Sequence, residues 1–248
     1  MSILPAGRYE LKYYLPFDRM SELLQWVQPY AEPDRHTRVD VEGMPRYTIR
    51  SVYLDADGLR LYQEKLDGKK NRVKFRVRSY HEPAPEVNVF LETKHRRNAQ
   101  ISKERVTLPL RFADPLVTSQ LKVCELDLPA HKRKGAERFV YYCRSWRLRP
   151  IVTVVYDRIA LIDRADQSVR LTVDVNLRCE DQRRAPHLFT PQPFEPVPLP
   201  GAILELKFNR LMPEWMRDTV RHFDLRQQSI SKYCLCVDVA VLKHHEPR

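Results

Sequence analysis

The sequence predicts an α+β fold, an eight-stranded antiparallel β-barrel with charged residues inside and helices packed on the outside. Eight segments alternate polar and apolar residues with the period of two that a strand requires. In seven of them, two charged or polar residues lie two positions apart and therefore project from one face. A barrel lined by these faces accounts for all seven pairs, and eight strands enclose enough space for a small ligand.

The eight predicted strands are spread along the chain. They cover residues 8–15, 47–54, 72–78, 89–94, 103–108, 152–159, 168–176 and 202–208. The three in the middle are the most strongly charged. In the first of these three, Val73, Phe75 and Val77 alternate with four Arg and Lys residues, which places the cations on one face and the apolar residues on the other.

Helices are predicted between the strands from apolar residues at helical spacing. Asp18 is predicted to cap the first helix, which Pro29 ends. The others are expected at about 57–66, 114–126 (with Leu121 in its apolar stripe), 133–146 and 213–223, with a last helix after 228–233. Residues 31–45 are predicted to be a loop, and the proline-rich stretch 185–201 an extended connection. Residues 1–248 are expected to form a single domain.

The charge balance predicts an anionic partner. Lys and Arg total 43 against 32 Asp and Glu, a formal net charge of +11. Such an excess fits nucleic acid, anionic lipid or phosphorylated small molecules. The five cysteines are odd in number and contain no CxxC pair, which indicates a reducing compartment. With no signal-peptide pattern and no apolar run of about 20 residues, we expect a cytoplasmic protein without a transmembrane segment.

The paired residues define the predicted lining. Three pairs are Glu-x-Lys, and four others share the two-residue spacing. They are Glu10/Lys12, Glu92/Lys94, Glu205/Lys207, Arg76/Arg78, Lys103/Arg105, Tyr156/Arg158 and Arg170/Asp174. The alternative is that these pairs lie on solvated faces of an open antiparallel sheet whose core is on the other side.

A lining of this kind predicts a metal–triphosphate ligand. Burying many cations without an anion is very costly, and Arg and Lys are the side chains that bind phosphate oxygens. Carboxylates among them would repel phosphate unless Mg²⁺ or Mn²⁺ lay between. The sequence has six glycines and no GxxxxGK[ST], GxGxxG or HExxH motif, so side chains must hold the phosphates. Lys232 could also reach them, or could belong to a helix cap formed by Ser229 and Ser231.

Nine motifs in chain order resemble the polyphosphate polymerase domain of the vacuolar transporter chaperone (VTC) complex. They are RYELKYYL, SVYLD, KFRVRSY, FLETK, SKERV, VVYDR, VRLTVD, ILELKF and SISKY, over about residues 8–240. The resemblance implies the triphosphate tunnel metalloenzyme (CYTH-like) fold, an eight-stranded tunnel with helices outside. It also implies transfer of the γ-phosphate of ATP to polyphosphate with Mn²⁺ or Mg²⁺. Arg8 stands where the hydrolase and cyclase branches carry a Glu, which favours the VTC branch.

The predicted site combines the lining with this resemblance. The expected catalytic residues are Lys12, Arg76, Arg78, Lys94, Lys103, Arg158 and Arg170. The expected phosphate-binding residues are Tyr156, Lys207 and Lys232. The expected metal ligands are Glu205, Glu10 and Glu92.

The predicted activity is that of a stand-alone ATP-dependent polyphosphate polymerase with ATP and polyphosphate as ligands. Two alternatives use the same site: a triphosphatase or nucleoside triphosphate hydrolase, and a non-catalytic polyphosphate- or nucleotide-binding module. Nucleic-acid binding is disfavoured, because the basic residues alternate with aliphatic residues rather than with the aromatic residues on which bases stack.

Overall fold

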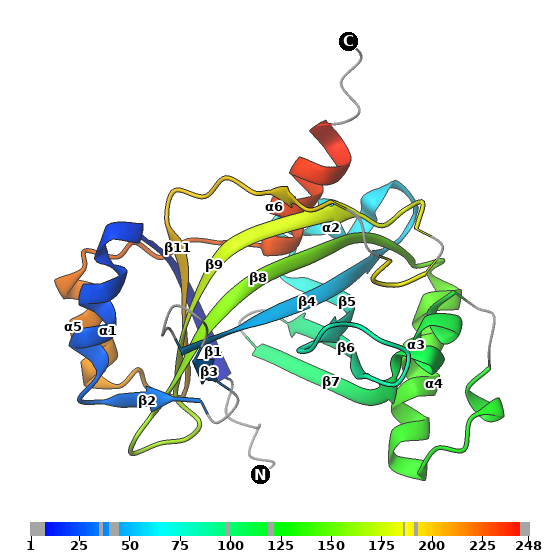
Figure 1. The fold of residues 1–248 in the computed structure, drawn as a ribbon, viewed down its shortest axis with the longest axis horizontal. Helices are drawn as coiled ribbons and strands as arrows, with labels where there is room; N and C mark the ends of the chain where they lie inside the picture. Colours follow the sequence, from blue (N-terminus) through cyan, green and yellow to red (C-terminus); the bar gives the residue numbers. More distant parts are fainter. Residues whose placement is uncertain are drawn as a thin grey trace.

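A curved antiparallel sheet dominates the computed structural model, which describes residues 8–34, 37–39, 45–97, 100–118, 122–185, 187–190 and 193–243 (Figure 1). In sheet order its main strands are β1 (Arg8–Leu15), β11 (Ala202–Asn209), β9 (Arg170–Asp181), β8 (Arg149–Asp163), β4 (Pro45–Asp55), β5 (Asn71–Ser79), β6 (Asn88–Arg97) and β7 (Gln100–Pro109). The short strands β2 (Ala31–Pro33), β3 (Arg38–Val39) and β10 (Glu195–Pro196) pair with β8, β4 and β9.

All eight predicted strands are present, but the closed barrel is not confirmed. Among the described residues, β1 pairs with β11 and β7 pairs with β6, and no ladder joins β1 to β7. The curvature still brings distant strands together, because Nζ of Lys94 on β6 lies 2.8 Å from Oε2 of Glu10 on β1. The sheet therefore has a concave side, called the inner face below.

The strand registers align charged residues across the inner face. Glu10 and Lys12 on β1 lie opposite Lys207 and Glu205 on β11. Toward the other end of the sheet order, β5, β6 and β7 place Lys74, Lys94 and Lys103 opposite one another. They likewise align Arg76, Glu92 and Arg105. Because the side-chain period is two, these rows project from the same face of the three strands.

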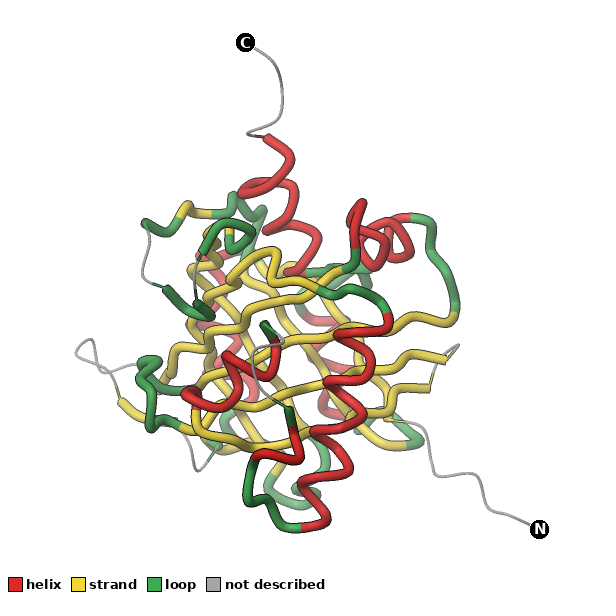
Figure 2. Tube along the Cα trace, turned by 90° about the vertical axis from the view of Figure 1, so that its right-hand side faces the viewer, coloured by secondary structure: helices red, strands yellow, loops and turns green. Residues whose placement is uncertain are grey.

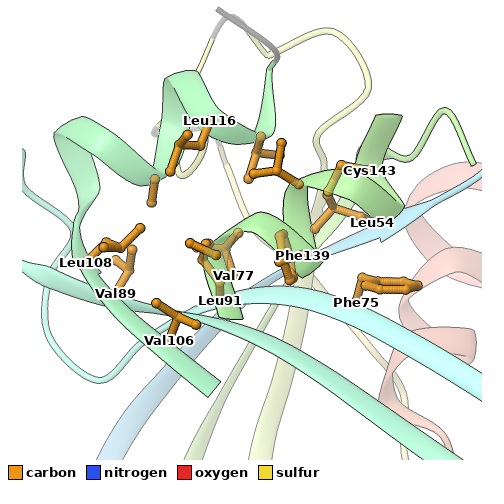
Figure 3. Packing of buried hydrophobic residues seen from close by; sticks show 14 of the residues in the cluster. Leu54, Phe75, Val77, Val89, Leu91, Val106, Leu108, Leu116, Phe139 and Cys143 are labelled. Atoms are coloured by element: carbon orange, nitrogen blue, oxygen red, sulfur yellow. The ribbon is translucent and has the colours of Figure 1, made fainter. Parts of the chain in front are cut away.

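Helices cover the outside of the sheet in two groups, as Figures 1 and 2 show. One group is α3 (Leu110–Val117) and α4 (Ala130–Ser145), which pack on β5, β6 and β7. Their contact with Phe75, Val77, Leu91 and Leu108 forms an apolar cluster (Figure 3). The other group is α1 (Met20–Val27) and α5 (Glu214–His222), which pack on β1, β9 and β11. The predicted helical cover is therefore present.

The start of α6 (Lys232–Val237) is held against the inner face by one buried carboxylate. Asp55, at the end of β4, accepts hydrogen bonds from the backbone N–H groups of Leu61 and Tyr62 and from the hydroxyl of Tyr233. It thereby fixes α2 (Arg60–Leu66) and α6 to the same strand end. A π-helical turn, Asp238–Leu242, continues α6.

Several boundaries differ from the sequence prediction. Asp18 lies inside a 3-10 turn, Phe17–Arg19, and its side chain makes no cap hydrogen bond. The helix expected at 114–126 instead begins directly after Pro109, and a separate 3-10 turn covers Val123–Glu125. Leu121 lies outside the described residues. The short strands β2, β3 and β10 fall within stretches that were predicted to be irregular. Among the described residues, no helix is long and apolar enough to cross a membrane.

Candidate functional site

Charged side chains on the inner face form two clusters, each named here after its central carboxylate. The Glu205 cluster contains Glu10, Lys12, Lys94, Arg158, Asp174, Glu205, Lys207 and Lys232. The Glu92 cluster contains Arg76, Arg78, Glu92, Lys103 and Arg105. Twelve of the thirteen come from strands, whose period places them on this face. Lys232 comes from the start of α6.

In the Glu205 cluster, one buried carboxylate is shared by several cations. Oε1 of Glu205 lies 3.2 Å from Nζ of Lys12 and 2.9 Å from Nζ of Lys232. Its Oε2 lies 2.7 Å from Nζ of Lys207 and 3.4 Å from Nη2 of Arg158. Burial raises the pKa of Glu205, but these cations, led by Lys12, outweigh burial and hold the pKa well below its usual value. Glu205 is therefore ionised at neutral pH.

Asp174 is the second anchor of this cluster. Its carboxylate makes a bidentate pair with Arg158, at 2.6 and 2.7 Å, and lies 2.5 Å from Nζ of Lys232. Burial lowers the pKa of Lys232, but Asp174 and Glu205 reverse this and raise the pKa above its usual value. Lys232 is thus charged although it is only 7% exposed.

The Glu92 cluster has fewer carboxylates for its cations, with one carboxylate among four cations. Glu92 is 1% exposed and accepts from Nε of Arg76 and Nε of Arg105, each at 2.7 Å, and lies 2.6 Å from Nζ of Lys103. Arg78 is 4.0 Å away. Burial raises the pKa of Glu92, and Arg76, Arg78 and Lys103 reverse this and lower it far below its usual value. Burial also lowers the pKa of Lys103 to about 8.

Tyr156 connects the two clusters. Its hydroxyl accepts from Nη2 of Arg78 at 3.2 Å. The guanidinium of Arg158 and the ammonium of Lys232 lie 5.3 and 4.9 Å from the centre of its ring, within the range of a cation–π contact. Tyr156 therefore contacts cations from both sides of the inner face.

The structure brings together most of the predicted site residues. Arg170 is the exception, because its side chain is 44% exposed and Nη1 lies 3.4 Å from Oδ2 of Asp34. The ambiguous Lys232 lies inside the Glu205 cluster. These positions are compatible with the predicted roles of the clustered residues but do not assign them.

Sequence reasoning missed four side chains of the inner face. Asp174 and Arg105 appeared in the paired pattern without receiving a role. Lys74 precedes Arg76 and Arg78 at the same two-residue spacing, so the strand period alone would have placed it on their face. Tyr53, on β4, accepts from Nη1 of Arg76 at 2.9 Å and stacks on Tyr233. No sequence signal joined Tyr53 to Arg76, because their contact depends on strand register.

The carboxylates of the inner face are the side chains that could hold a divalent cation. Within the described part of the chain, no group of three or more His, Cys, Asp or Glu side chains could hold a metal ion. Two carboxylates do meet at Lys12, whose Nζ lies 3.5 Å from Glu10 and 3.2 Å from Glu205. Mg²⁺ is commonly held by one or two carboxylates together with substrate phosphates, so this pair fits such an ion arriving with its phosphate ligand. Glu92 contacts a different set of cations.

A curved antiparallel sheet whose inner face carries more cations than carboxylates defines a protein suited to small polyanionic ligands. The family model described as the VTC domain matches residues 7–241, and the chain belongs to this family. The resemblance inferred from the nine motifs is thereby confirmed.

Solved structures with a similar course of the chain have little sequence in common with it. One is the PH1819 protein from Pyrococcus horikoshii, with 11% identity and a TM-score of 0.45 over 93% of this chain and 98% of the other. Another is HpAC1 from Hippeastrum, described as a putative adenylyl cyclase with a dominant triphosphatase activity. It has 11% identity and a TM-score of 0.46 over 97% and 100%. No curated protein matches the chain.

Proposed function

We propose that the chain is a metal-dependent phosphotransferase that moves the γ-phosphate of ATP onto a growing polyphosphate chain. The observation that carries the proposal is the Glu92 cluster, in which Arg76, Arg78, Lys103 and Arg105 share a single carboxylate. A partly buried surplus of cations is stabilised by a bound polyanion. Membership of the VTC family supports polyphosphate as that anion.

The reaction needs positioning more than acid–base chemistry. A terminal oxygen of the acceptor phosphate would attack the γ-phosphorus, and the bond from the γ-phosphorus to the bridging oxygen would break to release ADP. The attacking oxygen is already ionised, so no strong general base is required. Arg76 and Arg78 would hold the non-bridging oxygens in line and neutralise charge that develops in the transition state.

The Glu205 cluster would supply the metal position. Glu205 and Glu10 would hold Mg²⁺ or Mn²⁺, which neutralises phosphate charge and orients the β- and γ-phosphate oxygens. Lys12, Arg158, Lys207 and Lys232 would contact phosphate oxygens from this side. Tyr156 would orient Arg78 through their hydrogen bond.

We further propose that the curved sheet acts as a tunnel around the phosphates within a single 1–248 domain. The contact between Lys94 and Glu10 supports this, because it joins β1, at one end of the sheet order, to β6, which is next to the strand at the other end. A cytoplasmic, reducing setting is supported by the five cysteines, all of which are free thiols.

The test is to incubate the purified protein with ATP and Mn²⁺ and to resolve the products by chain length on a gel. A ladder of long chains, absent in Arg76→Ala/Arg78→Ala and retained in Lys69→Ala, is expected. Lys69 is a suitable control because its side chain is 54% exposed and pairs with Glu64, outside both clusters. Release of phosphate without chains would show a triphosphatase instead of a polymerase. Tight polyphosphate binding without turnover would show a binding module.

A further inference from the structure

Lys74, on the inner face, is a cation that no carboxylate balances. Each cation of the two clusters lies within 4.0 Å of at least one carboxylate. Nζ of Lys74 has no carboxylate within that distance anywhere in the described parts of the chain. Its polar contact is the hydroxyl of Ser231, 2.8 Å away, and the ring centre of Tyr233 lies 5.7 Å from it.

The strand register raises the cost of leaving Lys74 without a carboxylate partner. Lys74, Lys94 and Lys103 lie directly opposite one another on β5, β6 and β7. Like charges at opposite cross-strand positions destabilise a sheet. Glu10 balances Lys94 at 2.8 Å and Glu92 balances Lys103 at 2.6 Å, whereas Lys74 has only a hydroxyl. The row therefore carries a positive charge without a counter-ion in the folded protein.

Two hydroxyls beside Lys74 add to a possible anion site. Ser231 and Tyr53 are each 7% exposed. Ser231 Oγ accepts from Lys74 and from the backbone N–H of Cys234, and Tyr53 Oη accepts from Arg76. At about pH 7 each hydroxyl keeps a proton that it can donate to an anionic oxygen. Burial raises the pKa of Tyr53, but Arg76, Arg78 and Lys74 outweigh burial and lower this pKa to about 8. An ammonium flanked by hydroxyl donors is a suitable partner for a phosphate group.

We propose that Lys74, with Ser231 and Tyr53, forms an additional phosphate subsite, which holds one phosphate group of the condensed phosphate bound on the inner face. The proposal rests on the proposed function and adds a binding group to it. Lys74 acts as a binding residue here and takes no part in the transfer step.

The protonation of Lys74 supplies a second readout. Burial lowers the pKa of Lys74 to about 8, and no carboxylate opposes it. A phosphate at Nζ stabilises the ammonium, so binding raises this pKa and takes up protons near pH 8. The ionisable groups that act on Lys74 from the neighbouring elements are Tyr53 on β4, Lys94 on β6, Lys12 on β1 and Cys234 on α6.

The experiment is calorimetric titration of the full-length protein with inorganic tripolyphosphate, without added metal, at about pH 7 and about pH 9. Lys74→Met should weaken binding roughly tenfold or more at the lower pH, since a charge-assisted hydrogen bond is lost. Lys74→Arg keeps the charge at both pH values and should bind nearly as the unmodified protein does at pH 7. It should also lose less affinity at pH 9. Repeating the titration in two buffers of different ionisation enthalpy measures the proton uptake, which Lys74→Arg should reduce.

Controls separate this subsite from the proposed function. Lys69→Met should bind as the unmodified protein does, and the thermal melting of each variant shows whether it is folded. If Lys74 only supports the start of α6, Lys74→Met lowers the melting temperature but leaves the dissociation constant unchanged, which overturns the subsite. Equal binding by Lys74→Met, with binding lost in Arg76→Ala/Arg78→Ala, overturns the subsite alone. No tripolyphosphate binding by the unmodified protein, either without metal or with added Mg²⁺, overturns the proposed function as well.

Discussion

The two charged clusters of the inner face differ in how far they compensate their own charge. In the Glu205 cluster, Glu10, Asp174 and Glu205 face five cations. In the Glu92 cluster, Glu92 alone faces four. Glu92 and Glu205 are both ionised, because neighbouring cations hold their pKa values below the usual value. The first cluster has three carboxylates for five cations and the second has one for four, so the second has the larger surplus for a bound anion to neutralise.

This difference assigns different tasks to the two sides of the inner face. The Glu205 side contributes to the stability of the empty protein, and it offers the carboxylate oxygens that a divalent cation needs. The Glu92 side has one carboxylate and four cations, so a bound phosphate stabilises it most. Substitution of the two central carboxylates should therefore have different consequences for binding.

Glu205→Gln should have the largest effect. It leaves Lys12, Lys207 and Lys232 without their shared carboxylate, and breaking a buried ion pair from one side costs about 3–5 kcal/mol of unfolding free energy. Metal-dependent turnover should also be lost. Urea unfolding and the ATP assay measure the two effects. The control is Glu22→Gln, which removes the exposed pair with Arg19 and should leave stability nearly unchanged. If Glu205→Gln lowers the free energy of unfolding no more than the control does, the role of the Glu205 cluster in stability is contradicted.

Glu92→Gln should change stability and binding in opposite directions. The empty protein should be less stable, because Arg76, Lys103 and Arg105 lose their acceptor. Tripolyphosphate should bind more tightly, because a carboxylate that repels it is removed.

The pH dependence of Glu92→Gln tests the same point. The folded-state pKa of Glu92 lies below its ordinary value of 4.5, so its contribution to stability is present above about pH 4.5 and is lost as pH falls below that value. The difference in melting temperature between the unmodified protein and Glu92→Gln should therefore shrink on acidification. Weaker tripolyphosphate binding by Glu92→Gln would mean that Glu92 orients the arginine side chains for phosphate, besides compensating their charge.

Arg170→Ala should have the smallest effect, although the family resemblance gave Arg170 a catalytic role. Its side chain is largely exposed and lies 3.4 Å from Asp34, outside both clusters. We expect tripolyphosphate affinity to change less than about twofold, as for other exposed pairs. Arg158→Ala is the matched comparison, since Arg158 is 11% exposed and paired to Asp174 and Glu205. Similar losses in the two variants would show that Arg170 moves onto the phosphates when they bind.

The sequence predicted the faces of the strands better than the contacts between them. A period of two was enough to place Glu92, Arg76 and Arg78 on one side of the sheet. It could not show that Lys74, in the same strand, lacks a carboxylate partner, because that depends on the register of β5, β6 and β7 and on the position of Ser231. Closure of the barrel was predicted from the seven same-face pairs and the number of strands, whereas pairing of β1 with β7 depends on the curvature of the whole sheet.

The location of Lys232 shows the same limit. Its sequence context, SISKY, is compatible with both a helix cap and a ligand contact. The structure confirms the cap, because the Ser231 side chain caps α6, and it places Lys232 against Asp174 and Glu205, whereas the ligand contact stays a prediction. Asp55 makes this possible by fixing Tyr233, and no local pattern connects residues 55 and 233.

The pairing of β1 with β11 has a consequence for synthesis on the ribosome. Arg8 pairs with Asn209, so β1 leaves the ribosome long before the strand with which its hydrogen bonds form. Contacts this distant in sequence slow folding and leave an unpaired strand edge exposed in the meantime. A nascent chain that has not yet reached β11 also lacks Glu205, the shared partner of Lys12. It can therefore not assemble the Glu205 cluster until β11 has been synthesised.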